Sequence, residues 1–181
     1  QAGDETMFDY EYYGNPRIAR MWPSRGDVAG GTVVSVGGEG LRSGGIQCRF
    51  GDAGVVQGEH ASHITSTLVA CIAPSTVSKG QVVHVDLSLN DGADFVKTGF
   101  EFIYEATAMV EELIPSSGIS GSVGAAQAVT VVGQHFSHSE DLKCRFGLDV
   151  VVRALFASST RIVCPVPERG EGVVRVGVSN N

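Results

Sequence analysis

The chain has 181 residues, of which 43% are hydrophobic and 18% charged, so it can bury a core and is not expected to be disordered. Its formal net charge of −7 and pI near 5.1 argue against a nucleic-acid partner, whose phosphates this surface repels. No apolar run of about 18 residues and no signal-peptide pattern after Gln1 is present. We therefore expect a processed piece of a longer protein, without direct membrane insertion.

The 24 glycines, and prolines placed mostly between apolar runs, predict short strands joined by turns. The clearest strand is Val83–Leu89, where valine and leucine alternate with polar residues, so one face is buried. The first unit is predicted to contain strands Ile18–Trp22, Thr32–Val36, Gln47–Phe50, Val55–Gly58, Thr67–Ile72, Val83–Leu89 and Phe100–Tyr104, with turns at Pro23–Gly26 and Asn90–Gly92. About seven short strands in about 90 residues are typical of an immunoglobulin-like sandwich.

A second unit follows the same plan but lacks the last strand. Its predicted strands are Val110–Ile114, Val129–Val132, Leu142–Phe146, Val150–Phe156, Arg161–Cys164 and Val173–Val178. Asn180-Asn181 then stands where Leu89-Asn90 stands in the first unit.

An internal repeat of about 90 residues connects the two units. Cys48-Arg49-Phe50-Gly51 returns as Cys144-Arg145-Phe146-Gly147, and Phe8–Tyr12 matches Phe100–Tyr104. We therefore expect residues 1–15 to be the terminal strand of a preceding domain, residues 16–105 a first domain, and residues 106–181 a second domain without its final strand.

Each unit holds one pair of cysteines at matching places. Pairing Cys48 with Cys71, and Cys144 with Cys164, would close loops of about 20 residues and imply an oxidising, extracellular or cell-surface compartment. The alternative is buried free thiols of a cytosolic protein. A zinc site is disfavoured, because the sequence has no CxxC pair and its histidines do not recur between the repeats.

Other polar groups give little sign of chemistry. The His60/His63 and His135/His138 pairs are interpreted as solvated loops, and Asp91 and Asp94 around Gly92 as a turn rather than a calcium site. No nucleophile elbow or phosphate-binding loop occurs, so we expect no enzyme, no cofactor and no metal.

The repeated motifs resemble the IPT/TIG family of immunoglobulin-like domains. The resemblance rests on Pro23-Ser24-Arg25-Gly26, Gly30-Gly31-Thr32, Cys48-Arg49-Phe50-Gly51, Cys71-Ile72-Ala73-Pro74 and Phe102-Ile103-Tyr104, and on Pro115-Ser116-Ser117-Gly118, Cys144-Arg145-Phe146-Gly147 and Cys164-Pro165-Val166-Pro167 in the second unit. It implies an all-β fold of two tandem β-sandwiches. It also implies a spacer or binding module of an extracellular or surface protein.

The phase of the repeat suggests how units assemble. Phe8, Tyr10 and Tyr12 form an apolar stripe that would be exposed if unpaired, and the second unit lacks this same strand. Our hypothesis is an extracellular rod or filament in which this strand completes the last domain of the preceding repeat or protomer, covalently or by donor-strand addition. The partners are then neighbouring copies, head to tail.

Two alternatives remain open at this point. One is a cell-surface adhesion or receptor ectodomain that binds a protein or glycan. The other is an accessory module of a secreted carbohydrate-active enzyme.

Overall fold

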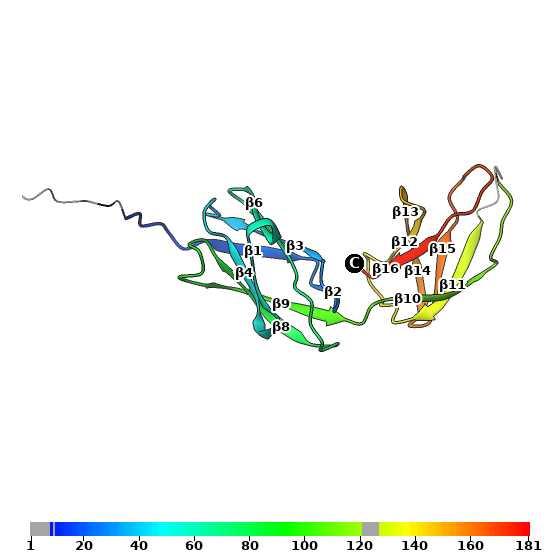
Figure 1. Cartoon of the computed structure of the whole chain (residues 1–181), viewed down its shortest axis with the longest axis horizontal. Coiled ribbons are helices and arrows are strands. Elements are labelled where there is room, and N and C mark those ends of the chain that lie inside the picture. The colour runs from blue at the N-terminus through cyan, green and yellow to red at the C-terminus, as the bar shows by residue number, and fades with distance from the viewer. Residues whose placement is uncertain (1–7, 9, 121–126) are drawn as a thin grey trace, which may run out of the picture.

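The structure is a computed structural model that describes residues 8, 10–120 and 127–181. Two β-sandwich domains lie one after the other along the chain (Figure 1). The predicted all-β fold of two tandem immunoglobulin-like domains is confirmed.

Domain 1 packs a four-stranded sheet, in the order β1-β3-β7-β6, against a five-stranded sheet, β2-β9-β8-β4-β5. All pairings are antiparallel except β2 with β9, which is parallel. The strands are β1 Arg17–Trp22, β2 Arg25–Asp27, β3 Val33–Glu39, β4 Gln47–Phe50, β5 Gly54–Gln57, β6 Ala61–Thr65, β7 Leu68–Ile72, β8 Val82–Ser88 and β9 Val96–Glu105, with short 3-10 turns η1 Gly51–Ala53 and η2 Gly58–His60.

Domain 2 has the sheets β10-β11-β15-β14 and β13-β12-β16 in its described residues. The strands are β10 Met109–Ile114, β11 Ala128–Gln134, β12 Lys143–Phe146, β13 Val150–Arg153, β14 Leu155–Ser158, β15 Arg161–Pro165 and β16 Val176–Ser179. The pairings between these described strands are antiparallel, as in a sandwich of this class.

The structure departs from the sequence prediction at three places. Strand β2 begins within the predicted Pro23–Gly26 turn, and β6 was not predicted, because neither shows an apolar alternation. The predicted strand Val150–Phe156 is two strands, because buried Ala154 donates its backbone N–H to Leu142 O and the chain crosses there from one sheet to the other.

Aromatic side chains from β4 and β9 fill the centre of domain 1. The Phe102 ring lies edge-on to Phe50 at 5.5 Å and to Tyr104 at 5.1 Å, and all three side chains are fully buried. Burial raises the pKa of the Tyr104 hydroxyl to about 12. Strand β9 therefore supplies two of the three central rings.

A disulfide joins the two sheets in each domain. Cys48 on β4 bonds to Cys71 on β7, and Cys144 on β12 bonds to Cys164 on β15. The paired Cα atoms lie 6.3 and 6.1 Å apart. Each bond therefore ties the inner faces of the two sheets together at the same place in the repeat.

A glycine allows a close approach of strands at the start of each domain. The register of β1 with β3 shifts beside Gly38, and that of β10 with β11 shifts beside Gly133. A Cβ atom on Gly38 would overlap the carbonyl oxygen of Arg17, and one on Gly133 would overlap that of Met109. These glycines are thus required by backbone contact and not by a left-handed conformation.

Replacing Gly38 with alanine is expected to lower the free energy of unfolding of domain 1 by about 1–3 kcal/mol, because the methyl group forces β1 away from β3. The chain has one tryptophan, Trp22 in β1, so its fluorescence during urea unfolding reports on domain 1. Gly14→Ala is the control, since a Cβ there meets no atom within 4 Å. Equal midpoints for the two variants would contradict this account.

The disulfides predict that the cysteines resist alkylation even in denaturant when no reductant is present, whereas all four react after unfolding in reductant. In the chain-entropy account each bond contributes roughly 3 kcal/mol. The intact mass after alkylation gives the number of cysteines that have reacted. Cysteines that are alkylated in denaturant without reductant would instead support the free-thiol alternative.

Candidate functional site

The junction between the domains is short. Strand β9 ends at Glu105 and β10 begins at Met109, so residues 106–108 alone connect them. The C-terminal residue lies at this junction, while residues 10–16 leave domain 1 at its opposite end (Figure 1). Side chains from both domains therefore meet around a connection that has little freedom.

Strand β2 fixes the exit of β9 toward domain 2. Arg25 Nη1 donates to Glu105 Oε1 at 2.6 Å, and Asp27 Oδ1 accepts a 2.7 Å hydrogen bond from Thr107 Oγ1. The same Asp27 oxygen accepts the backbone N–H of Ala29 at 2.7 Å. The first residues after β9 are thus held by a charged residue at each end of β2.

A second set of contacts reaches across from domain 2. Asn181 Nδ2 donates to Thr32 Oγ1 of domain 1 at 2.8 Å. Buried Asn180 accepts the backbone N–H of Ser137 at 3.0 Å and donates to the carbonyl oxygen of His135 at 2.7 Å. The end of β16 is therefore anchored in domain 2 before it contacts domain 1.

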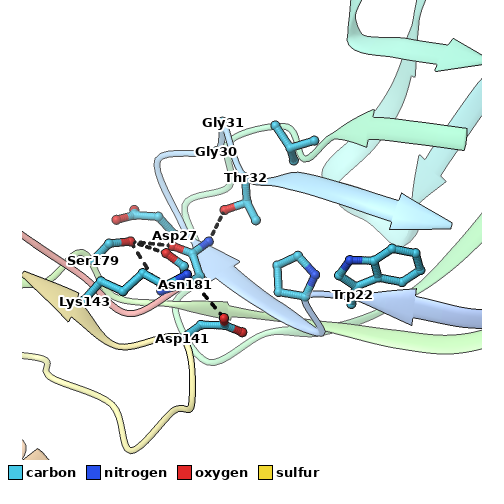
Figure 2. A pocket seen from close by; sticks show the side chains of 11 residues that line it. Trp22, Asp27, Gly30, Gly31, Thr32, Asp141, Lys143, Ser179 and Asn181 are labelled. Carbon is cyan, nitrogen blue, oxygen red and sulfur yellow. Dashed lines mark hydrogen bonds and ion pairs between the residues drawn. The ribbon is translucent and has the colours of Figure 1, made fainter. Parts of the chain in front are cut away.

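A cleft of about 550 Å³ opens beside these contacts. Trp22 lies on one side of it, and Asp141, Lys143 and Asn181 lie on the other (Figure 2). The Trp22 side chain is 41% exposed, and the Arg20 guanidinium lies 4.7 Å from its ring centroid. The full lining is Trp22, Pro23, Asp27, Gly30, Gly31, Thr32, Val33, Asp141, Lys143, Ser179 and Asn181.

The β13-β12-β16 sheet of domain 2 corresponds to the domain 1 sheet that contains β4 and β8, but its apolar residues are more exposed. Cys48 and Phe50 of β4 face Leu87 and Val85 of β8, and the matching β12 residues Cys144 and Phe146 face Val178 and Val176 of β16. This register makes Val174, Val176 and Val178 the equivalents of Val83, Val85 and Leu87.

Exposure differs sharply between these equivalent residues. Val83, Val85 and Leu87 are 5%, 1% and 0% exposed on β8, which lies beside β9 in the same sheet, whereas Val174 is 39% exposed and Val176 and Val178 are only partly buried. Strand β16 pairs only with β12 within the part of the chain that is described.

The predicted inter-repeat segment lies outside both sandwiches. Phe8, Tyr10 and Tyr12 are 92%, 80% and 90% exposed, and none is assigned to a strand. Position 9, between them, lies outside the described residues.

The four histidines considered as metal ligands do not come together in one cluster. His63 contacts the Leu41 carbonyl oxygen, His135 contacts that of Thr107, and the His138 ring lies 5.2 Å from Phe156. His60 is exposed within η2. No cluster of three or more candidate metal ligands occurs among the described residues.

The Asp91–Asp94 segment is a turn, as predicted. Asp91 has a positive φ of 56° and is followed by Gly92 at 82°, and Asn90 Nδ2 donates to Asp94 at 3.1 Å. Arg49 faces outward and pairs with Asp86 at 2.6 Å.

Sequence reasoning missed the junction residues Arg25, Asp27 and Thr32. Two features of the sequence could have pointed to the junction: Trp22, and the recurrence of Ser88-Leu89-Asn90 as Ser179-Asn180-Asn181. Both serine hydroxyls accept the N–H of the asparagine two residues later. This equivalence marks the end of β16 as the start of a turn.

None of the helices in the described part of the chain has the length and apolar character needed to cross a bilayer. Among known proteins, fibrocystin-L of Mus musculus is 23% identical over 162 residues, which cover 90% of this chain and 4% of that protein.

Two structures of the plexin A4 extracellular region share the fold. One aligns with a TM-score of 0.60 at 18% identity, over 89% of this chain and 13% of that chain. The other aligns with a TM-score of 0.51 at 20% identity, over 91% and 16% respectively. The chain spans only a small part of each of these relatives. It belongs to the IPT/TIG domain family, whose domain it matches over residues 16–104 and again over residues 113–181.

Proposed function

We propose that this chain is a non-catalytic structural repeat of an extracellular rod or filament, in which IPT/TIG domains are stacked head to tail. The observation that carries the proposal is the bonded junction: Thr107 is held by Asp27, and Asn181 by Thr32, across a connection of residues 106–108. A short connection with side-chain contacts from both domains restricts their relative rotation.

The N-terminal side of domain 1 resembles the same junction. Arg42 donates to Glu11 at 2.5 Å and lies 4.6 Å from the Tyr13 ring centroid, so the chain entering β1 is also held by a side chain. This hydrogen bond holds the pKa of the Glu11 carboxyl below its usual value. The Phe8–Tyr12 strand then completes the last domain of the preceding repeat or protomer.

The disulfides and the relatives support an extracellular location. Disulfides persist in oxidising compartments, and the plexin A4 structures with this fold are of an extracellular region. We place the chain outside the cell or on its surface.

The junction is tested by loosening it without touching either core. The double variant Thr107→Val with Asn181→Ala removes one hydrogen bond between domain 1 and the connection and one between the two domains, and should broaden the distribution of distances between spin labels placed on the two domains. The native chain should give one narrow distribution. Thr65→Val, which removes two hydrogen bonds between Thr65 and Thr67 within domain 1, is the control.

Equally broad distributions in the native chain and the double variant would contradict a stiff junction and with it the rod. Both variants should stay folded and melt within several degrees of the native chain, because each such hydrogen bond contributes only about 0.5–1.5 kcal/mol.

A second candidate function, a surface ectodomain that binds a glycan, is favoured by the cleft. It places a half-exposed indole opposite a carboxylate, an ammonium and an amide, at a domain boundary where ligand sites often occur. A sugar ring has an apolar face that can rest on Trp22 and hydroxyls that can bond to Asp141 and Lys143.

Binding to a glycan array separates the two candidates. If the cleft binds sugars, Trp22→Ala should abolish the signal, whereas Val77→Ala, at a fully exposed loop residue, should leave it unchanged. Absence of signal for the native chain, or a signal that Trp22→Ala leaves intact, would remove the cleft as a glycan site.

A further inference from the structure

We infer that the outward face of the β13-β12-β16 sheet binds a sulfated polysaccharide through a row of four cations, Lys143, Arg145, Arg153 and Arg175, called the basic row below. The inference goes beyond the proposed structural role. It uses side chains of domain 2 alone, so it does not require that domains stack into a rod.

Two of the cations lie on β12 and point away from the core. Cys144 and Phe146 of this strand are buried, so the side chains of Lys143 and Arg145 lie on the other side of the sheet. Arg153 of β13 is directly opposite Lys143 in the antiparallel register and therefore shares that side. Arg145 and Arg153 are exposed, and Lys143 is partly exposed.

The fourth cation, Arg175, lies where the chain enters β16. Its carbonyl oxygen accepts the backbone N–H of Gly147 at 2.8 Å, just before β16 begins at Val176. Gly177, two residues after Arg175, lies opposite Arg145. Because residues two apart on an extended chain share a face, exposed Arg175 is on the outward side and is the diagonal neighbour of Arg145.

The four cations form a line across the sheet and do not converge on one point. Neighbouring strands are about 4.8 Å apart, and the steps along a strand or along a diagonal are about 7 Å, so the path along the basic row measures on the order of 20 Å. Guanidinium groups bind oxyanions through paired N–H donors. A line of such groups fits a linear chain that carries several sulfates better than it fits one small anion.

Most of this charge has no partner within the protein. Among the described residues, Arg145, Arg153 and Arg175 make no ion pair. Lys143 Nζ lies 3.4 Å from Asp141 Oδ1, but both side chains are about half exposed, so solvent weakens this pair. Residues 106–181 contain six Lys and Arg residues, and four of them belong to the basic row. The cations of domain 2 are therefore concentrated on one face of an acidic chain.

The equivalent face of domain 1 lacks this excess of charge. Arg49 is the equivalent of Arg145, and it pairs with Asp86 of β8 at 2.6 Å. In domain 2 the equivalent of Asp86 is Gly177, which cannot neutralise Arg145. The other three cations correspond to uncharged or weakly basic residues of domain 1, namely Gln47, Gln57 and His84. The basic row thus belongs to the second repeat and is not a consequence of the shared fold.

Acidic residues near the basic row limit the width of its partner. Glu140 and Asp141 precede β12, Asp149 follows it, and the chain as a whole has a formal net charge of −7. A broad anionic surface, such as duplex DNA or a lipid bilayer, would bring like charges against these carboxylates. A single flexible polyanion can follow the basic row alone. The disulfides favour the extracellular space, where sulfated polysaccharides occur.

The test is binding of the full chain to immobilised heparin, measured by surface plasmon resonance at several salt concentrations. The native chain should bind, with an affinity that falls as salt is added, because salt screens exposed charges. The double variant Arg145→Gln with Arg175→Gln should weaken binding at least about tenfold, since it removes two charged hydrogen-bond donors. Arg161→Gln is the control, because exposed Arg161 lies on β15 in the other sheet and its loss should leave binding unchanged.

A substitution copied from domain 1 separates charge from shape. Gly177→Asp recreates the Arg49–Asp86 pair in domain 2, and a Cβ at this position meets no atom within 4 Å. This variant should bind heparin at least about tenfold more weakly than Gly177→Asn, which has nearly the same shape without the charge. Equal binding by the two variants would overturn the inference.

Three further outcomes would also overturn it. One is a native chain that binds no heparin at low salt or that binds desulfated heparin equally well. Another is binding of duplex DNA, or of vesicles that contain anionic lipid, as tight as that of heparin, because charge alone would then explain the contact. The last is loss of heparin binding in Trp22→Ala, which would move the site to the cleft. The spin-label distances across the junction are independent of all these results, so the rod and the polysaccharide surface are tested separately.

Discussion

Domain 1 depends on the pairing of β8 with β9. Strand β9 completes the hydrophobic core, because its Phe102 and Tyr104 side chains are fully buried. The same strand leads directly into the connection to domain 2. The last two residues of β9 are held from two sides. The Tyr104 backbone exchanges hydrogen bonds with the Gly80–Gln81 segment, and the Glu105 carboxylate accepts a hydrogen bond from Arg25. Core closure and domain orientation therefore have the same structural cause.

The sequence predicts well those elements whose side chains alternate. Val83–Leu89 is β8 almost residue for residue, and Gln47–Phe50 is β4, because a half-buried antiparallel strand leaves a two-residue period. The strand β2 leaves no such pattern. Its three residues are placed by parallel pairing with β9, about 80 residues away in the chain. Nearby sequence does not encode a partner at that distance.

The junction is harder to predict for the same reason. Thr32 and Asn181 are separated by 149 positions and meet only when both domains are folded and placed. Their residue types are common in loops, where either side chain usually contacts water or its own turn. The repeat nonetheless carried one useful signal, since it aligned Asn181 with Asn90 at the start of the Asn90–Gly92 turn. Internal symmetry thus indicated the local turn at Ser179–Asn181, but not its contact with Thr32.

Comparison of equivalent residues in the two repeats shows that the domains differ in how much apolar surface they bury. Domain 1 holds aromatic rings on its own last strand, while domain 2 in its described residues has Val174, Val176 and Val178 without such a cover. The β9 rings remove from water apolar surface whose counterpart in the described part of domain 2 stays partly exposed. Burial of apolar area therefore contributes more to the described fold of domain 1 than to that of domain 2.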